Sequence, residues 1–222
     1  MTTIIDYGIG NLRSIEKAFE TVGATVHRTD DPETISAAER LVLPGVGAFR
    51  ACIDEIRHRN LEGPIHDAID RGVPFLGVCV GMQLLFETGY EKGEHEGLGV
   101  LPGHVAHFRE TDAEMPDDLS VPHMGWNAIE STRSHPLLDD LGDDPYVYFV
   151  HSYHPVADTA SDVLATTTYG HPFPSVVQRG NVFGVQFHPE KSQAAGLGLL
   201  ENFATLAPDD HPERVASNQD SR

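Results

Sequence analysis

A cysteine flanked by glycines is the residue of this chain best suited to covalent chemistry. Cys79 lies in the segment Gly77–Gln83 (GVCVGMQ), after the apolar run 73–76 and before the apolar run 82–86. A nucleophile at a tight turn from a strand into a helix, with small residues two places to either side, is typical of a nucleophile elbow. A helix that starts beside the sulfur favours the thiolate over the thiol. The ordinary alternative is a core cysteine, because free cysteines are among the most buried residues.

His188 and Glu190 supply the two groups that a cysteine nucleophile needs beside it. His188 follows the apolar run 182–187, so we expect it at the same edge of a sheet as Cys79. It would act as the base, and Glu190 would fix its tautomer and stabilise the imidazolium. Pro189 stiffens the turn between them. Each residue alone could be a surface loop residue, but together with the elbow they predict a catalytic triad.

Acyl transfer also requires two hydrogen-bond donors for the oxyanion. One candidate is the amide of Val80, which directly follows the nucleophile. The other should come from the loop Gly45–Gly47, and we assign it to Val46 and Gly47, because the glycines allow a peptide to rotate. An ordinary turn between a strand and a helix would also explain this loop. Loss of one donor typically costs ~10²–10³ in rate, so the orientation of the loop could act as a switch.

Alternating strand and helix patterns should position these residues. Apolar runs predict strands at 3–7, 25–29, 40–43 and 73–76, and helical spacing predicts helices at 12–22, 49–56 and 61–71, with a small helix starting at Asp31-Pro32. This order implies an α/β fold with an open, mostly parallel sheet and helices on both faces. Ligands bind at the carboxyl ends of such strands, where the loops after Leu43 and Val78 lie. Cys52 falls on the apolar face of its helix and is predicted to be core.

The second half of the chain is less regular. Residues 82–86 predict a helix, 87–97 a loop, and 100–108 a small antiparallel β region. Further strands are predicted at 146–150, 163–168, 175–178 and 182–187, followed by a helix at 193–206. We interpret residues 1–206 as one domain and residues 207–222 as an acidic polar tail.

Composition narrows the choice of partners and compartment. The 222 residues carry a net charge of −19, with 34 acidic and 15 basic side chains, which argues against binding to nucleic acid or to anionic membranes. We find no apolar stretch of membrane-spanning length, no signal peptide and no disulfide framework, so a reducing cytoplasmic location fits best. The acidic surface also suggests adaptation to high salt. A melting temperature that stays unchanged between molar and millimolar salt would contradict this hypothesis.

Two distant segments resemble one enzyme family. Gly77–Gln83 and Val185–Glu190 are similar to the motifs of class I, triad-type glutamine amidotransferases. Segments 5–12, 43–49, 122–127 and 188–192 further resemble the glutaminase subunits of imidazole glycerol phosphate synthases. The resemblance covers residues 3–206 and implies a flavodoxin-like α/β fold.

The resemblance implies a reaction and the residues that carry it out. Cys79 would attack the side-chain amide of glutamine, His188 would move the proton and Glu190 would hold His188, and water would then hydrolyse a glutamyl thioester. Four residues would hold the glutamine, namely Gly45, Gln83, Ser152 and Tyr153.

The resemblance also implies a partner. The ammonia would pass to a (β/α)₈-barrel cyclase subunit in a heterodimer, which makes imidazole glycerol phosphate and aminoimidazole carboxamide ribotide in histidine biosynthesis. Rotation of the Val46 peptide would switch the glutaminase on. Trp126 and Lys191 match positions at the partner interface, although a core tryptophan and a solvated lysine are the ordinary alternatives.

No cofactor, metal, nucleotide or flavin is implied. His151, Ser152 and His154 could suggest a zinc site, but a single cluster without cysteine or nearby aspartate is a weak signal. Three other functions remain open: a glutaminase of the purine, pyridoxal phosphate or tryptophan pathway, a stand-alone cysteine hydrolase, and a non-catalytic binding module. The first would be identified by the synthase that raises glutamine turnover. Cleavage of peptides would indicate the stand-alone hydrolase, and a thiol that fails to react with a glutamine-like electrophile would indicate the binding module.

Overall fold

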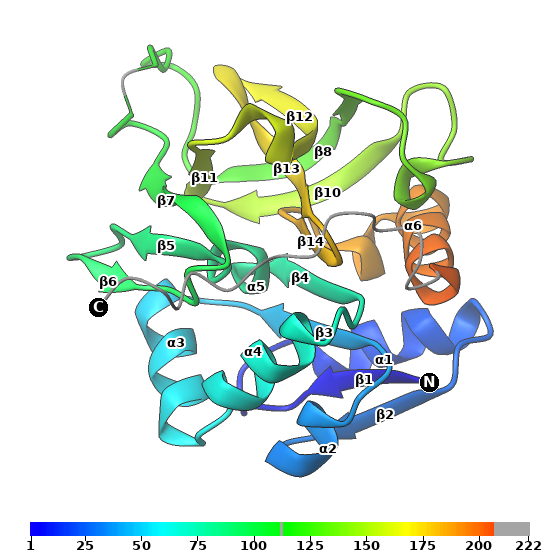
Figure 1. The fold of residues 1–222 in the computed structure, drawn as a ribbon. Helices are drawn as coiled ribbons and strands as arrows, with labels where there is room; N and C mark the ends of the chain where they lie inside the picture. Colours follow the sequence, from blue (N-terminus) through cyan, green and yellow to red (C-terminus); the bar gives the residue numbers. More distant parts are fainter. Residues whose placement is uncertain (112, 207–222) are drawn as a thin grey trace.

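An eight-stranded sheet forms the centre of the molecule (Figure 1), in the order β2-β1-β3-β4-β14-β13-β12-β9. The computed structural model describes residues 1–111 and 113–206. Five neighbouring strands run parallel: β2 (Val26–Thr29), β1 (Thr2–Ile5), β3 (Leu41–Gly45), β4 (Phe75–Cys79) and β14 (Val182–Val185). The antiparallel strands β13 (His171–Arg179), β12 (Val163–Tyr169) and β9 (Glu130–Ser131) complete the sheet. The mostly parallel α/β sheet predicted from the sequence is confirmed.

Helices cover both faces of this sheet (Figure 1). On one face lie α2 (Pro32–Ser36), α3 (Phe49–His58) and α4 (Glu62–Asp70), and on the other α1 (Leu12–Thr21) packs against α6 (Gln193–Thr205). The Asp31 side chain caps α2 by accepting a hydrogen bond from the Thr34 N–H at 2.8 Å, with Pro32 in the first turn, as expected. None of the helices in the described ranges is long and apolar enough to cross a membrane.

Two smaller sheets flank the carboxyl end of the central sheet. One pairs β8 (His123–Ala128) with β10 (Tyr146–His151) in antiparallel fashion. The other has the order β11-β7-β5-β6 and contains β11 (Tyr153–Ala157), β7 (Leu101–His107), β5 (Phe86–Gly89) and β6 (His95–Glu96). The remaining elements are the one-turn helix α5 (Val80–Gln83) and the 3₁₀ segments η1 (Pro136–Leu138), η2 (Ala160–Asp162) and η3 (Pro189–Lys191).

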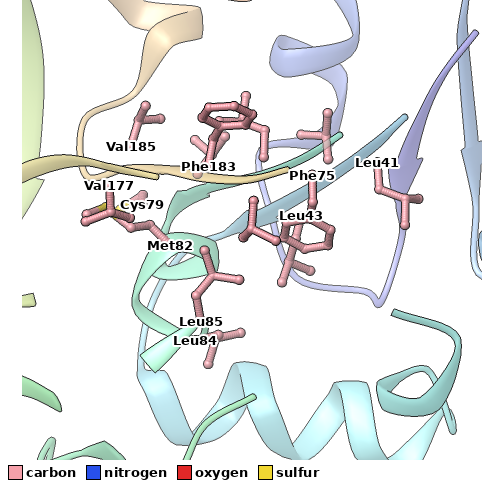
Figure 2. Close-up of a cluster of buried hydrophobic side chains, with 14 of the residues drawn as sticks. Leu41, Leu43, Phe75, Cys79, Met82, Leu84, Leu85, Val177, Phe183 and Val185 are labelled. Carbon is pink, nitrogen blue, oxygen red and sulfur yellow. The ribbon is translucent and has the colours of Figure 1, made fainter. Parts of the chain in front are cut away.

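The core lies where the middle strands meet α5. Every residue of β3 and β4 is buried, as expected for parallel strands covered on both faces. Figure 2 shows side chains from β3, β4, α5 and β14 packed together, with Cys79 at one end of the cluster. Cys52 is fully buried in α3, which confirms the prediction that it belongs to the core.

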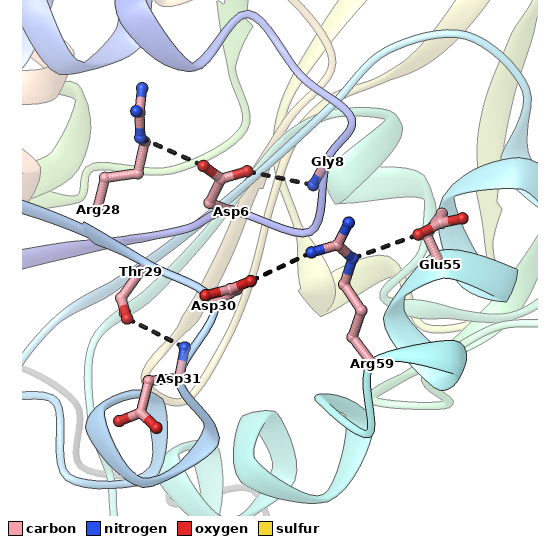
Figure 3. Close-up of polar contacts among 8 residues, drawn as sticks. All are labelled: Asp6, Gly8, Arg28, Thr29, Asp30, Asp31, Glu55 and Arg59. Atoms are coloured by element: carbon pink, nitrogen blue, oxygen red, sulfur yellow. Dashed lines mark hydrogen bonds and ion pairs between the residues drawn. The ribbon is translucent and has the colours of Figure 1, made fainter.

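Polar contacts order the loops that follow β1 and β2 (Figure 3). The Asp6 carboxylate accepts a hydrogen bond from the Gly8 N–H at 3.2 Å and pairs with Arg28 at 3.3 Å. Gly8 has φ of +86°, a conformation that glycine adopts readily. Arg59, at the end of α3, pairs with Asp30 at 3.2 Å. The Asp6–Gly8 turn places Asn11 at the start of α1, beside the triad described below.

Two predictions around residues 82–97 are wrong. The helix predicted at 82–86 ends at Gln83: Leu84 and Leu85 form a turn, and Phe86 begins β5. The predicted loop at 87–97 contains β5 and β6, which pair as a hairpin. Its polar residues lack the apolar alternation by which sequence patterns reveal a strand.

Other strands were outside the sequence prediction or differ from it. The strands β8, β9 and β11 were not predicted, and β7 pairs antiparallel with β11 but parallel with β5. Strand β13 begins at His171, before the predicted start at 175, although it includes Pro172 and Pro174. Both prolines lie where β13 pairs only with β12, since its pairing with β14 starts at Val176. The predicted tail, 207–222, lies outside the described residues, and the division into domains stays a prediction.

Candidate active site

Cys79 lies at a sharp turn between β4 and α5. It has φ of +56° and ψ of −112°, which is strained for a residue with a side chain. The neighbouring glycines allow close contact: a Cβ on Gly81 would lie 1.9 Å from the Leu43 carbonyl oxygen, and one on Gly77 would lie 2.5 Å from the Gly81 carbonyl oxygen. The elbow geometry therefore requires glycine at both positions. The helix that follows has only four residues, so its dipole is smaller than the sequence suggested.

His188 and Glu190 lie at the same sheet edge as Cys79. Strand β14 pairs with β4, with Val185 opposite Val78, so the chain after β14 reaches the sheet edge that carries Cys79. The His188 Nδ1 lies 3.0 Å from the Glu190 Oε1, and their side chains are only 4% and 2% exposed. The carboxylate can only accept, so Nδ1 carries a proton and Nε2 is the nitrogen left for chemistry at Cys79.

The electrostatics of His188 favour its charged form. Burial alone would lower its pKa, but hydrogen bonds with Cys79 and Glu190, together with their charges, outweigh burial and raise the pKa to about 9. The imidazolium is therefore the preferred form of His188 at neutral pH. A protonated histidine beside the sulfur is ready to donate a proton to a leaving group.

Asn11 adds a contact to the triad that the sequence reasoning missed. Its side-chain amide donates to the Glu190 Oε1 at 3.4 Å, while the Glu190 Oε2 is buried and finds no hydrogen-bond partner among the described residues. Asn11 and Glu190 are 179 positions apart. The available signal was that Asn11 lies in segment 5–12, which carries part of the family resemblance.

The backbone of His188 is tied to β10. The His188 N–H donates to the Tyr148 carbonyl at 2.9 Å, and the Ser192 hydroxyl accepts from the Tyr148 N–H at 2.9 Å and donates to the His188 carbonyl at 2.6 Å. Two hydrogen bonds therefore hold the turn that carries His188 against a strand of a different sheet, and the third closes the turn itself.

A cavity of about 370 Å³ opens over Cys79. The predicted residues Val46, Gly47, Cys79, Val80, Gln83, Ser152, Tyr153, His188 and Lys191 line it, and so do Glu91, Pro122, Val150 and His151, which were not predicted. Gly45 is not among the lining residues: it pairs with Cys79 and packs against the elbow instead, which argues against direct contact with a ligand.

Gln83 is built into the wall of this cavity. Its Nε2 donates to the Tyr153 carbonyl at 2.9 Å and to the Gln186 Oε1 at 3.1 Å. The Gln186 Nε2 in turn lies 3.9 Å from the Cys79 Sγ. The fully buried Gln186 was missed, although it lies in the segment 185–190 that carries the family motif.

Two neutral histidines support the same wall. The Asn127 Nδ2 lies 3.4 Å from the His123 Nε2, the His123 Nδ1 lies 3.2 Å from the His151 Nε2, and the His151 Nδ1 lies 2.9 Å from the Tyr153 carbonyl. The amide and carbonyl ends set the direction of donation along this chain. Burial lowers the pKa of His123 to about 4 and that of His151 well below its usual value. In the part of the chain that the structure describes, no three His, Cys, Asp or Glu side chains could together hold a metal ion.

The candidate oxyanion donors Val46, Gly47 and Val80 all line the cavity over Cys79. Val80 directly follows Cys79 and is buried in the elbow. Val46 and Gly47 line the cavity, but the Val46 carbonyl accepts a hydrogen bond from the Cys52 thiol at 3.4 Å. The peptide that joins Val46 to Gly47 is therefore held by α3 through its carbonyl.

Trp126 and Lys191 lie on one exposed face. Trp126 is 46% exposed, so the alternative of a core tryptophan is excluded. Its ring lies 6.2 Å from that of Tyr148, and the Lys191 Nζ lies 5.8 Å from the same tyrosine ring. Met124 and Tyr146 are also exposed on β8 and β10. We call Met124, Trp126, Tyr146, Tyr148 and Lys191 the β8–β10 face.

Comparisons with known proteins agree on one family. Residues 3–206 match the family model described as glutamine amidotransferase class-I. The chain is 85% identical over 217 residues to the imidazole glycerol phosphate synthase subunit HisH of Salinibacter ruber, covering 98% of this chain and 100% of that protein. It is 49% identical to the protein of the same name from Syntrophotalea carbinolica, covering 93% and 100% of the two chains.

Solved structures support the fold. A crystal structure described as glutamine amidotransferase superposes with a TM-score of 0.67 at 20% identity, covering 92% of this chain and 99% of that one. The structure of PurLQS from Thermotoga maritima gives a TM-score of 0.66 at 18% identity, covering 91% and 96%. At these identities the likeness shows the shared fold alone.

Proposed function

Because this chain belongs to the class-I glutamine amidotransferase family, we propose that it releases ammonia from glutamine through Cys79, His188 and Glu190. It is a glutamine amidotransferase and serves as the glutaminase subunit of an imidazole glycerol phosphate synthase in histidine biosynthesis, in line with its 85% identity to a subunit of that name. The assignment of these residues rests on one observation: the buried His188 side chain is hydrogen-bonded to Glu190 on one side and to Cys79 on the other.

The first half of the reaction forms a thioester. The Cys79 sulfur attacks the side-chain amide carbon of glutamine, and the C=O electron pair moves onto oxygen. The Val80 N–H and a donor from Val46 or Gly47 stabilise this oxyanion. His188 then gives its Nε2 proton to the amide nitrogen, the C–N bond breaks, and ammonia leaves the glutamyl thioester.

The second half regenerates the enzyme. Neutral His188 accepts a proton from water as the water oxygen attacks the thioester carbon. The C–S bond breaks, glutamate leaves, and the sulfur and His188 return to their starting states. Glu190 keeps the Nδ1 proton on His188 through both steps, so only Nε2 exchanges protons with the reactants.

The polar groups of the cavity suit a free amino acid. The Glu91 carboxylate lines the cavity and can pair with the α-ammonium group of glutamine. Gln83 has both Nε2 contacts occupied, which leaves its carbonyl oxygen for the same ammonium group. Ser152 and Tyr153 form the facing wall, and Gly45 shapes the elbow from behind.

The β8–β10 face is proposed as the docking surface for a cyclase subunit. The relatives are named as subunits of a synthase, which implies a partner. Exposed aromatic side chains beside a cation are typical anchors of protein interfaces. Lys191 also lines the active-site cavity, so this face lies next to the place where ammonia forms. Two free buried cysteines fit a reducing, cytoplasmic location.

Glutamine hydrolysis by the purified chain tests this proposal. We expect near-silence for the chain alone and strong turnover once the cognate cyclase subunit and its ribotide ligand are added, with Cys79→Ser inactive in both states. Full activity without a partner would favour a stand-alone hydrolase, and activation only by another synthase would favour a different pathway. Inactivity in every state, with Cys79 confirmed as reduced, would contradict the proposed chemistry.

A further inference from the structure

The Cys79 sulfur has a second polar neighbour besides the histidine of the triad. The Gln186 Nε2 lies 3.9 Å from the Cys79 Sγ, and the Gln186 side chain is fully buried. Cys79 is itself only 4% exposed, so bulk water has little access to the sulfur. A buried charge is costly unless it is hydrogen-bonded, and the four-residue helix α5 contributes only a small dipole. Donors from protein side chains must therefore stabilise a thiolate at this position.

The neighbours of the Gln186 amide determine which of its ends faces the sulfur. The Tyr153 carbonyl can only accept, so the Gln83 atom that lies 2.9 Å from it is the NH₂ group of that side chain. The same NH₂ group donates to the Gln186 amide at 3.1 Å, and the atom that accepts there must be Oε1. The NH₂ group of Gln186 is thus the end that lies toward Cys79.

The backbone of Gln186 is fixed to the central sheet. Its N–H donates to the Ser175 carbonyl of β13 at 2.9 Å. The preceding residue, Val185, pairs with Val176 of β13 on one side and with Val78 of β4 on the other. The donor is therefore held in place before any substrate binds, and it needs no reorganisation during the reaction.

We propose that Gln186 is a further catalytic residue, whose side-chain N–H donates to the Cys79 thiolate and stabilises its charge. This inference rests on the proposed function and adds to the triad a neutral donor at the sulfur. In the second half of the reaction, the water oxygen attacks the thioester carbon and the water proton moves to His188. The C–S bond then breaks, its electron pair returns to sulfur, and the Gln186 N–H stabilises the charge that forms. Gln186 itself neither gains nor loses a proton.

Gln186→Met tests this role, because it removes the donor and keeps a side chain of similar length. Ser175→Ala is the matched control. Ser175 is fully buried on the neighbouring strand, its hydroxyl finds no hydrogen-bond partner within the described residues, and the backbone carbonyl that holds Gln186 stays in the variant.

The first measurement is alkylation of Cys79 by iodoacetamide in the purified full chain, from about pH 5 to about pH 10. The labelled peptide is identified by mass, so that reaction at Cys52 is counted separately. This reaction requires neither glutamine nor a partner. The second measurement is steady-state glutamine hydrolysis with the cyclase subunit and its ribotide ligand present.

We expect the acid limb of the alkylation profile to move to higher pH by about one unit in Gln186→Met, and not to move in Ser175→Ala. A hydrogen bond to a charged group shifts such an equilibrium by about tenfold or more, and the long contact to sulfur favours the lower end. The stimulated kcat of Gln186→Met should fall by about tenfold for the same reason. A role confined to holding Gln83 would instead raise the KM for glutamine and leave the alkylation profile unmoved.

The wild-type chain gives a third measurement, which does not depend on the folding of a Gln186 variant. The NMR signal of the Gln186 side-chain amide should shift over the pH range in which alkylation rises. In Cys79→Ala this shift should be absent, although His188 is still present to titrate.

Three results would overturn the inference: an unmoved acid limb in folded Gln186→Met, an equal movement in Ser175→Ala, or an amide signal of Gln186 that does not change with pH. If the wild-type pair hydrolyses glutamine while any of these results is found, the role of Gln186 fails and the proposed function stands. If the wild-type pair never hydrolyses glutamine but the acid limb and the amide signal move as expected, the proposed function fails and the donor to the sulfur stands.

Discussion

Glu190→Gln isolates the contribution of one buried charge, because it keeps the shape of the side chain. Glu190 accepts the Nδ1 proton of His188 at 3.0 Å, and its side chain is only 2% exposed. Burial alone lowers the pKa of His188, and Cys79 and Glu190 together raise it to about 9. With glutamine at position 190, Cys79 alone opposes burial. The pKa of His188 should therefore fall, and less imidazolium should be present at neutral and alkaline pH.

The size of the effect follows from the geometry. A hydrogen bond to a charged group contributes about 1.5–3 kcal/mol, and the short, buried contact here favours the upper end. This free energy equals a fall of about one to two units in the pKa of His188 and about a ten- to 150-fold loss in kcat/KM. The basic limb of the pH–rate profile should move to lower pH by the same one to two units.

The assay is stimulated glutamine hydrolysis from about pH 6 to about pH 10, with alkylation of Cys79 over the same range as a readout that needs no partner. Glu201→Gln, an exposed change on α6, is the matched control for net charge. A large loss of activity with an unmoved basic limb would refute the electrostatic role of Glu190. Full activity in the variant would refute its place in the triad.

Three further predictions concern stability and assembly. Gly81→Ala places a Cβ 1.9 Å from the Leu43 carbonyl oxygen. The variant should have a free energy of unfolding lower by about 3 kcal/mol and no glutamine turnover. A decrease of less than about 1 kcal/mol in the free energy of unfolding, measured in urea, would contradict this prediction. Burial lowers the pKa of His154 to about 4, below its unfolded value, so its contribution is complete above about pH 6.5 and is lost as pH falls toward 4. His154 should contribute about 2 kcal/mol to the loss seen in urea unfolding by pH 5, and His154→Phe should reduce the loss by that amount while the part due to His123 and His151 remains; equal slopes would argue against this. Trp126→Ala should weaken binding of the cyclase subunit by about 2 kcal/mol, or about 30-fold in Kd. The melting temperature should not fall, because Trp126 is 46% exposed. An unchanged affinity in titration calorimetry would exclude Trp126 as an interface anchor.

The sequence was most informative where local patterns decide the structure. Glycines two places before and after Cys79 specify the elbow, and an apolar strand before His188 brings the histidine to the same sheet edge. The triad could therefore be predicted from two short segments. The roles of its members stay predictions until variants are measured.

The supporting contacts depend on distant parts of the chain. Asn11 reaches Glu190 across 179 positions, and Gln83 reaches Gln186 across 103. No periodicity or spacing encodes such pairs. Glu91 lies in the turn between β5 and β6, and nothing in the polar sequence around it indicates that it lines the cavity.

The antiparallel half was hardest to predict for a physical reason. Strand β8 contains His123, Gly125 and Asn127, which are residues that commonly form turns or sites rather than strands. Its pairing with β10 and the packing of His123 on Phe149, with ring centroids 4.7 Å apart, determine its conformation. Tertiary contacts therefore override the weak strand preference of the segment.

The hydrogen bonds between His188 and Tyr148 have a consequence for redesign of the subunit. Tyr148 belongs to the exposed β8–β10 face through its ring, yet its backbone holds His188 on both sides, directly and through Ser192. One strand, β10, thus belongs to the proposed docking surface and also holds the backbone of His188. Redesigning this surface for a different synthase therefore changes more than docking specificity. Any substitution that shifts the β10 backbone also shifts the imidazole of His188, so partner specificity and the rate of glutamine hydrolysis will change together.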